Sequence, residues 1–373
     1  MIAAASTTKY RPRPPAGGQP VNEPTAEQVA VAVVGGGQAG LAMGHALTRR
    51  GLRGGRDFVL LDAADRVGAS WDSRWDSLRL FTPARHTALP GLPFPGPPDA
   101  YPGKDDVASY LRRYAAQFEL PVRSGTRVER LIRDPAGPGF VLTTNRGTVR
   151  AGRVVAATGP FQVPAIPRVG VDLAPRVVQL HSGEYRNPAQ LPDGRVVVVG
   201  AGNSGAQIAT ELAETHDVTL AVGTRQPRLP QHVAGRDLFF WLTRTHIMDI
   251  TVGSRLGRRL ATTEALIGTR LPDVARRGVR LTGRLTGVDG DTVSLTGGDR
   301  QQVDAVVWAT GYRPDYTWLP TEAVGADGWP LHRRGVSPVP GLGVLGLPWL
   351  HTRGSALVGW VGRDASWLAE QLG

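Results

Sequence analysis

Three glycines in the stretch Val29–Gly40 have a spacing that suits phosphate binding. Gly35, Gly37 and Gly40 form a G-x-G-x-x-G motif between a run of apolar residues and a helical pattern over Leu41–Arg50. In such a strand–turn–helix unit, the glycines allow a tight turn, a close approach of the backbone to a pyrophosphate, and close packing of the helix on the strand. The unpaired N–H groups at the start of the helix then attract the phosphates.

A carboxylate follows at the distance that a bound ribose requires. Phe58–Leu61 is a second apolar run, and Asp62 comes directly after it, 22 residues beyond Gly40. An acid about 20 residues after the motif accepts hydrogen bonds from the ribose hydroxyls. The sequence therefore predicts a dinucleotide site, formed by the glycine turn together with Gln38 and Asp62.

A second glycine turn repeats this arrangement. Gly200, Gly202 and Gly205 have the same spacing, and they lie between a predicted strand over Arg195–Val199 and a predicted helix over Ala206–Thr215. Asn203 and Ser204 complete the second turn. We expect this turn to bind a second dinucleotide.

The strand predicted after the second turn ends differently from the first. Val218–Val222 leads into Gly223-Thr224-Arg225, so an arginine stands where the first site has Asp62. A carboxylate would repel a 2′-phosphate, whereas a guanidinium binds it in a bidentate manner. The second site is therefore expected to prefer NADPH through Arg225, with Arg228 as an equally placed alternative.

Two strands are predicted to end in the same Ala-Thr-Gly phrase. Thr158 and Gly159 follow the run Arg153–Ala157, and Gly311 closes the run Val306–Thr310. Because glycine adds no side chain, such an ending allows a ligand or another backbone to come close. The repeat indicates either an internal duplication or two crossings between linked domains.

The composition is that of a globular protein with two domains. The chain has 373 residues, of which 41% are apolar and 20% charged, and it has no cysteine. A disulfide framework, a cysteine-ligated metal site and a thiol redox centre are thereby excluded, and no metal site is predicted. The net charge of +11 comes from arginines that are interleaved with acids, which argues against nucleic-acid binding. We predict an α/β fold with two Rossmann-like dinucleotide-binding domains.

No targeting or membrane-spanning segment is predicted. Residues 1–28 are rich in Pro, Ala, Gly and Thr and are expected to form a disordered extension. No apolar run approaches the roughly 20 residues of a membrane-spanning helix. A cytoplasmic protein is the default expectation, and a homodimer is compatible with the sequence.

Four other segments bear on the site. The stretch Ser70–Pro83 is dense in Trp, Arg and Asp, and the proline-rich stretch Leu89–Pro102 is expected to be an irregular loop. We favour cofactor contact over a merely structural cover for this region. Asp237–Arg270 is rich in aromatic residues and arginine; packing between domains is favoured over contact with a membrane or a substrate channel. Gly354 and Ser355 lie in a turn that opens a helix near the end of the chain, where N–H groups could face an anion or a flavin carbonyl.

Two dinucleotide sites of different preference fit FAD at the first turn and NADPH at the second. Electrons would pass from the nicotinamide to the flavin. From there they could reach a disulfide, a carrier or quinone, or oxygen, and the lack of cysteine removes the first of these routes.

Several motifs together resemble those of the flavin-containing monooxygenase-like proteins, which include the plant YUCCA enzymes and bacterial flavoproteins linked to potassium transport. The resemblance extends from about Val29 to the C-terminus. It rests on GGGQAG, SWDSRWDSLRLFTP, ATGPFQVP, GAGNSG, WATGYRPDYTWL and GLPWLHTRGSA.

The resemblance implies an FAD domain of residues 29–165 and 300–373 and an inserted NADPH domain of residues 166–299. It also implies an NADPH-dependent monooxygenase that oxygenates a small lipophilic substrate with O2, through a C4a-(hydro)peroxyflavin. An NADPH-dependent reductase that serves a carrier or quinone, and a non-enzymatic flavin redox sensor for a transport partner, remain as alternatives.

The resemblance also assigns roles to single residues. Trp71, Thr82 and Asn203 are implied as catalytic, with Trp71 and Thr82 beside the isoalloxazine and Gly354 and Ser355 at its pyrimidine end. The glycine turns, Asp62, the Ala-Thr-Gly endings and Arg225 complete the predicted cofactor sites.

Two features depart from the family pattern. His181 and Tyr185 supply only the second half of the signature F-x-G-x-x-x-H-x-x-x-Y/W. The tyrosine in place of tryptophan, with no Pro-Asp after it, argues against a specialist Baeyer–Villiger enzyme. The flavin-side asparagine of many relatives is replaced within Leu80–Pro83. His181 is interpreted either as part of the site or as a buried packing residue.

Overall fold

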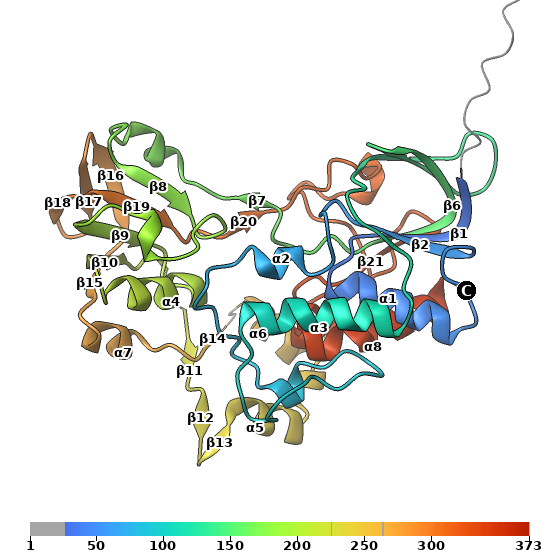
Figure 1. Cartoon of the computed structure of the whole chain (residues 1–373), viewed down its shortest axis with the longest axis horizontal. Helices are drawn as coiled ribbons and strands as arrows, with labels where there is room; N and C mark the ends of the chain where they lie inside the picture. The colour runs from blue at the N-terminus through green and yellow to red at the C-terminus, as the bar shows by residue number, and fades with distance from the viewer. Residues whose placement is uncertain (1–26, 225, 263–264, 373) are drawn as a thin grey trace, which may run out of the picture.

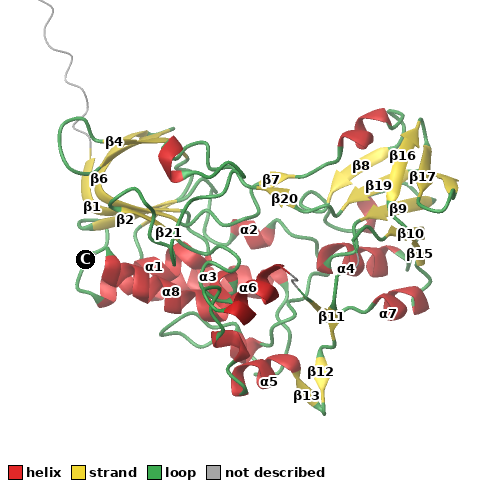
Figure 2. Cartoon of the chain, turned by 180° about the vertical axis from the view of Figure 1, so that it is seen from behind, coloured by secondary structure: helices red, strands yellow, loops and turns green. Residues whose placement is uncertain are grey.

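The computed structural model describes residues 27–224, 226–262 and 265–372. Two sheets lie at opposite ends of the molecule, each with helices packed beneath it, and the short strands β7 (Val163–Pro164) and β20 (Tyr312–Arg313) lie between them (Figures 1 and 2). We call the two parts the first unit and the second unit. They correspond to the two predicted Rossmann-like domains.

The sheet of the first unit has the strand order β3-β2-β1-β6-β5-β4, with β21 also paired to β6. Strands β1, β2, β3 and β21 run parallel to β6, whereas β4 and β5 form an antiparallel extension. The strands are β1 (Glu27–Val34), β2 (Phe58–Leu61), β3 (Val122–Arg123), β4 (Val128–Arg133), β5 (Phe140–Thr144), β6 (Gly147–Ala156) and β21 (Leu342–Val344).

Three long helices cover one face of this sheet: α1 (Gln38–Arg49), α3 (Lys104–Gln117) and α8 (Val358–Gln371) (Figure 1). Their apolar faces form one core with the inward side chains of β1 and β2. Because α8 lies near the C-terminus and α1 near the N-terminus, the core of the first unit is formed by segments from both parts of the sequence. Shorter pieces are α2 (Ala69–Asp72), η1 (Ala84–His86), η5 (Thr321–Ala323) and η6 (Arg353–Ala356).

The second unit has a parallel sheet in the order β15-β10-β9-β19-β8. Helices α4 (Asn203–Leu212) and α7 (Leu271–Arg276) contribute to an apolar core on one face. An antiparallel sheet of β16, β17 and β18 contributes to the core on the other face. The remaining elements of the second unit are η2 (Arg168–Asp172), β8 (Val178–His181), η3 (Pro188–Gln190), β9 (Arg195–Val199), β10 (Asp217–Ala221), β15 (Arg280–Thr282), β16 (Leu285–Asp289), β17 (Thr292–Leu295), β18 (Arg300–Gln302) and β19 (Ala305–Trp308).

The residues between β10 and α7 form a small extension that hangs below the two units (Figures 1 and 2). Its β12–β13 hairpin reaches furthest from the sheets. Across the described residues, no helix combines the length and the apolar composition that a bilayer span needs. The extension contains β11 (Arg228–Leu229), β12 (His232–Val233), β13 (Arg236–Asp237), α5 (Leu238–Arg244), η4 (Ile247–Asp249), α6 (Arg255–Thr262) and β14 (Leu266–Ile267).

Strand pairing differs from the expected division of the chain at two places. The FAD domain was expected to resume at residue 300, but β19 lies between β9 and β8 in the second sheet. The chain leaves the second unit only at β20, which pairs with the outgoing strand β7. At the other end, β1 begins at Glu27, inside the expected extension of residues 1–28, and residues 1–26 lie outside the described part.

Candidate dinucleotide sites

The first glycine turn is closed by backbone atoms that leave no room for side chains. Gly35 has φ +114°, and a Cβ built on it would lie 2.5 Å from the carbonyl oxygen of Ala157. A Cβ on Gly40 would lie 1.8 Å from the carbonyl oxygen of Gly35. These contacts bring α1 against the end of β1, as the sequence predicted. They also bring the first Ala-Thr-Gly ending against the turn, which the sequence did not predict.

Gly37 differs from the other two glycines because it faces open space. No atom of the described residues lies within 4 Å of a Cβ built there. Gly37 is the N-cap of α1, with ordinary extended dihedral angles, and the first helical turn has no acidic residue. The free N–H groups of α1 therefore point into a space suited to an anion.

Asp62 lies directly against this turn, at the end of β2. Its Oδ2 is 2.5 Å from the point where a Cβ of Gly36 would lie, and its Oδ1 accepts the N–H of Ala64 at 3.2 Å. Burial raises the pKa of Asp62, and the backbone N–H donors oppose this rise. A partly buried acceptor beside the glycine turn fits the predicted contact with a ribose.

The second turn repeats the geometry of the first. A Cβ on Gly200 would lie 2.4 Å from the carbonyl oxygen of Ala309, and one on Gly205 would lie 1.9 Å from that of Gly200. Gly202, like Gly37, has no neighbour within 4 Å of its built Cβ among the described residues. In both units, the alanine carbonyl oxygen of the Ala-Thr-Gly ending thus closes a glycine turn.

Asn203 and Ser204 begin α4, directly after this turn. The Oδ1 atom of Asn203 is buried, and no donor from residues 27–224, 226–262 or 265–372 reaches it. A buried acceptor without a partner costs free energy unless a donor from another molecule satisfies it. The second turn thus also fits a dinucleotide.

Of the two arginines predicted beyond β10, only Arg228 lies in the described part of the chain. Arg225 lies outside the described residues. Arg228 donates to the carbonyl oxygens of Ala201 and, at 2.7 Å, of Thr269. Burial lowers the pKa of Arg228. Arg228 therefore connects the second turn to the residues that follow β14, and its guanidinium already donates hydrogen bonds to two backbone carbonyl oxygens.

Arg284, which was not predicted, lies beside the residues that follow β10. It follows β15, the parallel neighbour of β10, and its Nη2 donates to Oγ1 of Thr224 at 3.3 Å. Its side chain is exposed, and no carboxylate in the described part of the chain pairs with it. Nothing in the spacing of the sequence pointed to this arginine.

The Ala-Thr-Gly endings are fixed by hydrogen bonds from neighbouring segments. Thr158 Oγ1 accepts Nε2 of Gln162 at 2.8 Å, and the carbonyl oxygen of Gly159 accepts the Tyr316 hydroxyl at 3.1 Å. The carbonyl oxygen of Gly311 lies 2.8 Å from Nε2 of His181. His181 is fully buried, and burial lowers its pKa, so this residue has the contacts of a packing histidine.

Gln38 brings three of the predicted flavin-side segments together. Its Oε1 accepts Nε1 of Trp71 at 3.4 Å, and its Nε2 donates to the carbonyl oxygen of Ala356 at 3.5 Å. Ser355, next to Ala356, is buried, and its Oγ accepts the N–H groups of His351 and Thr352. Ser355 thus fixes the turn from within.

Gly354 and Thr82 lie beside an aromatic cluster formed by Phe81, His86, Phe239 and Trp360. A Cβ on Gly354 would lie 2.6 Å from Cβ of Trp360, and the N–H of Gly354 is bonded to Thr352. Thr82 is buried, and its Oγ1 accepts the hydroxyl of Thr87 at 3.2 Å. The cluster makes this side of the first unit apolar.

The aromatic part of the segment Asp237–Arg270 has the favoured packing role. Phe239 is fully buried and stacks on Phe81 with ring centroids 6.0 Å apart. In contrast, the Leu256 side chain of α6 is 53% exposed. The extension therefore packs on the first unit through α5.

Comparisons with known proteins agree with this architecture. Residues 32–236 match the family described as pyridine nucleotide-disulphide oxidoreductase. An uncharacterized CzcO-like oxidoreductase of Geobacillus kaustophilus is 41% identical over 92% of this chain and 98% of its own. The indole-3-pyruvate monooxygenase YUCCA1 of Oryza sativa is 28% identical over 83% of this chain and 82% of its own. The solved structure of a flavin-containing monooxygenase from Stenotrophomonas maltophilia superimposes with a TM-score of 0.76 and 28% identity, covering 93% of this chain and 98% of that one.

Proposed function

From its membership of the flavin monooxygenase-like oxidoreductases, which include the CzcO-like proteins, we propose that the chain oxygenates a small lipophilic substrate with O2. Members of this group use FAD and NADPH, and so does this chain. The proposal assigns FAD to the first unit, built from both ends of the chain, and NADPH to the second unit between β7 and β20. A cytoplasmic location and a homodimer stay predictions.

The observation that carries the proposal is the duplicated glycine turn, with a carboxylate near the first copy and a guanidinium near the second. Each turn has an open middle glycine at a helix N-terminus, which suits a pyrophosphate. The first turn has the carboxylate of Asp62 beside it, whereas the neighbourhood of the second contains the cation of Arg284. A bare ribose fits the first turn, and a 2′-phosphate fits the second.

In this proposal Gly35, Gly37, Gln38, Gly40 and Asp62 hold FAD. The second turn holds NADPH, with Asn203 offering its buried acceptor and Arg284 reaching the 2′-phosphate. Thr158, Gly159 and Gly311 shape the space between the cofactors. Arg225 remains a predicted contact outside the described residues.

When bound and reduced, the flavin supplies the reaction with O2 and the transfer of one oxygen atom. The contribution of the chain is to bind, to orient and to exclude water. Trp71 orients Gln38, and the aromatic cluster beside Thr82 keeps the neighbourhood apolar. An apolar neighbourhood limits the entry of water and favours a lipophilic substrate.

The test is an isotope experiment with the FAD-loaded protein. NADPH and isotopically labelled O2 are supplied with a panel of lipophilic sulfides, amines and ketones, and products are analysed by mass spectrometry. A product that carries one labelled oxygen, formed only with both cofactors, supports the proposal. NADPH consumption that yields only peroxide across the panel would refute the oxygenase, and rapid quinone reduction without oxygen would establish the reductase instead. No flavin reduction by NADPH would leave the redox sensor.

A further inference from the structure

Residues 70–80, which we call the bridging segment, leave the first unit and pack into the core of the second. The Trp75 and Leu78 side chains are 5% and 9% exposed, and both belong to the apolar cluster of the second sheet. That cluster also contains Ala206, Ile208 and Ala209 of α4. The bridging segment is therefore part of the second unit in its packing, although it precedes that unit in the sequence by about a hundred residues.

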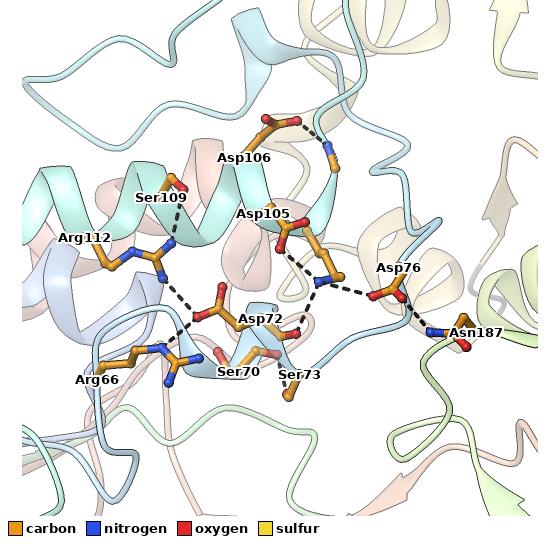
Figure 3. A network of polar contacts seen from close by, with 12 residues as sticks. Arg66, Ser70, Asp72, Ser73, Asp76, Asp105, Asp106, Ser109, Arg112 and Asn187 are labelled. Carbon is orange, nitrogen blue, oxygen red and sulfur yellow. Dashed lines mark hydrogen bonds and ion pairs between the residues drawn. The ribbon is translucent and has the colours of Figure 1, made fainter. Parts of the chain in front are cut away.

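Polar contacts fix the middle of the bridging segment to the second unit (Figure 3). The N–H of Asp76 donates to the carbonyl oxygen of Arg186 at 2.7 Å. The Asp76 carboxylate accepts Nδ2 of Asn187 at 2.8 Å. These bonds prevent the middle of the segment from sliding along the second unit.

Gln207 makes a two-point contact with the end of the same segment. Its Oε1 accepts the backbone N–H of Arg79 at 3.4 Å, and its Nε2 donates to the backbone carbonyl oxygen of Arg79 at 3.2 Å. Gln207 lies in α4, one turn after Asn203 at the start of that helix. Helix α4 is thus connected directly to the main chain of the bridging segment.

The beginning of the bridging segment is fixed to the first unit. Nε1 of Trp71 donates to Gln38 in the first glycine turn at 3.4 Å. The Asp72 carboxylate pairs with Arg112 of α3 at 3.0 Å and with Arg66 at 3.1 Å, and Lys104 approaches both the Asp72 carbonyl oxygen and the Asp76 carboxylate at 3.5 Å (Figure 3). One continuous stretch therefore connects the flavin-side turn to α4.

We infer that Gln207 is a positioning residue for hydride transfer between the two cofactors. The inference rests on the proposed function, in which α4 begins at the NADPH turn and Gln38 lies at the FAD turn. Gln207 touches neither reacting group; it fixes α4, and the turn before it, to the segment that carries Trp71. Because hydride transfer depends steeply on distance, a misplacement of about 1 Å costs roughly a hundredfold in rate.

The test is anaerobic stopped-flow reduction of the FAD-loaded enzyme by NADPH. Gln207→Ala is expected to lower the limiting rate of flavin reduction about tenfold, while the Kd for NADPH stays within about twofold. A primary isotope effect with deuterated NADPH should persist, because the transfer itself is slowed. Thr210→Ala is the matched control: the Thr210 hydroxyl donates to the carbonyl oxygen of Ala206 in the same helix at 2.8 Å, and the rate of this variant should not change.

Gln207→Glu gives a second variant that keeps the acceptor for the Arg79 N–H and loses the donor to the Arg79 carbonyl. Its rate is expected between those of wild type and Gln207→Ala. An unchanged rate in Gln207→Ala, a loss confined to Kd, or loss of the isotope effect would each overturn the inference. Flavin reduction by NADPH needs no oxygen, so the effect of Gln207→Ala can be measured even if the protein oxygenates no substrate. If NADPH does not reduce the flavin of the wild-type protein at all, the proposed function itself is wrong.

Discussion

Alanine at Gly37 or Gly202 should separate cofactor binding from folding, because neither position requires glycine in the protein itself. Their φ angles are −76° and −67°, which any residue adopts, and no atom in the described ranges lies within 4 Å of either built Cβ. The added methyl group would instead occupy the space where a pyrophosphate meets the helix N-terminus. Loss of one charge-assisted hydrogen bond costs about 1.5–3 kcal/mol, which corresponds to a rise in Kd of about 10- to 150-fold.

Gly40 and Gly205 provide the contrast, because a Cβ there would lie 1.8 and 1.9 Å from a carbonyl oxygen. Alanine at these positions forces the backbone of the turn to move and should lower the thermal stability of the cofactor-free protein. The assay therefore measures two quantities for each variant. Thermal unfolding of the cofactor-free protein is followed by circular dichroism, and the affinities for FAD and NADP+ are measured by calorimetry.

Gly37→Ala is expected to weaken FAD alone, and Gly202→Ala is expected to weaken NADP+ alone in the FAD-loaded enzyme, both with unfolding temperatures close to that of wild type. The reasoning would be refuted if Gly37→Ala bound FAD as tightly as wild type. It would equally be refuted if Gly202→Ala weakened FAD and left NADP+ binding unchanged, since the turns would then have been assigned to the wrong cofactors.

Three further predictions follow from the contacts of single side chains. Arg284→Ala should raise the Kd for NADPH about tenfold and leave that for NADH unchanged; equal effects on both, in a fluorescence titration, would remove the 2′-phosphate role. Asp62→Asn should raise the unfolding temperature of the FAD-free protein, since burial raises the pKa of Asp62 and its charge opposes folding, yet weaken FAD binding; a loss of both would indicate a structural role. Burial lowers the pKa of His181 below its ordinary 6.5, so the unfolded state binds more protons and stability should fall as pH falls through this value. His181→Gln should reduce that fall in unfolding temperature between about pH 7.5 and about pH 5.5, and an unchanged slope would show that other buried histidines determine it.

The sequence was sufficient where local spacing determines local geometry. Both glycine turns, the strands before them and the helices after them were predicted, because each glycine role is set within six residues. Asp62 was found for the same reason, since one strand–helix–strand unit fixes its distance from the turn. Both helix starts were misplaced by three residues: α1 begins at Gln38 rather than Leu41, and α4 begins at Asn203 rather than Ala206. The reason is that the middle glycine, and not the first apolar residue, caps the helix.

Contacts between distant segments could not be predicted from spacing. Arg284 comes close to Thr224 only because β15 pairs with β10, and sixty residues separate the two side chains. Cofactor contact was favoured for the region that includes Ser70–Pro83, but the structure places Trp75 and Leu78 of this stretch in the core of the second unit. The expected return to the first unit at residue 300 failed because a short apolar run such as β19 does not reveal which sheet it joins.

The match to disulphide oxidoreductases and the absence of cysteine together indicate which part of the protein determines the electron acceptor. The shared fold brings a nicotinamide to a flavin, and that part is common to enzymes with different electron acceptors. This chain has no thiol among its 373 residues, so it has no dithiol of its own to receive the electrons. The fate of the reduced flavin must then depend on the side chains that surround it. Under the proposed function, these side chains include in the first unit the buried Thr82 and the aromatic rings of Phe81, Phe239 and Trp360. An apolar wall of this kind excludes water and admits O2 and lipophilic molecules, which is the selection that an oxygenase needs and a thiol reductase does not.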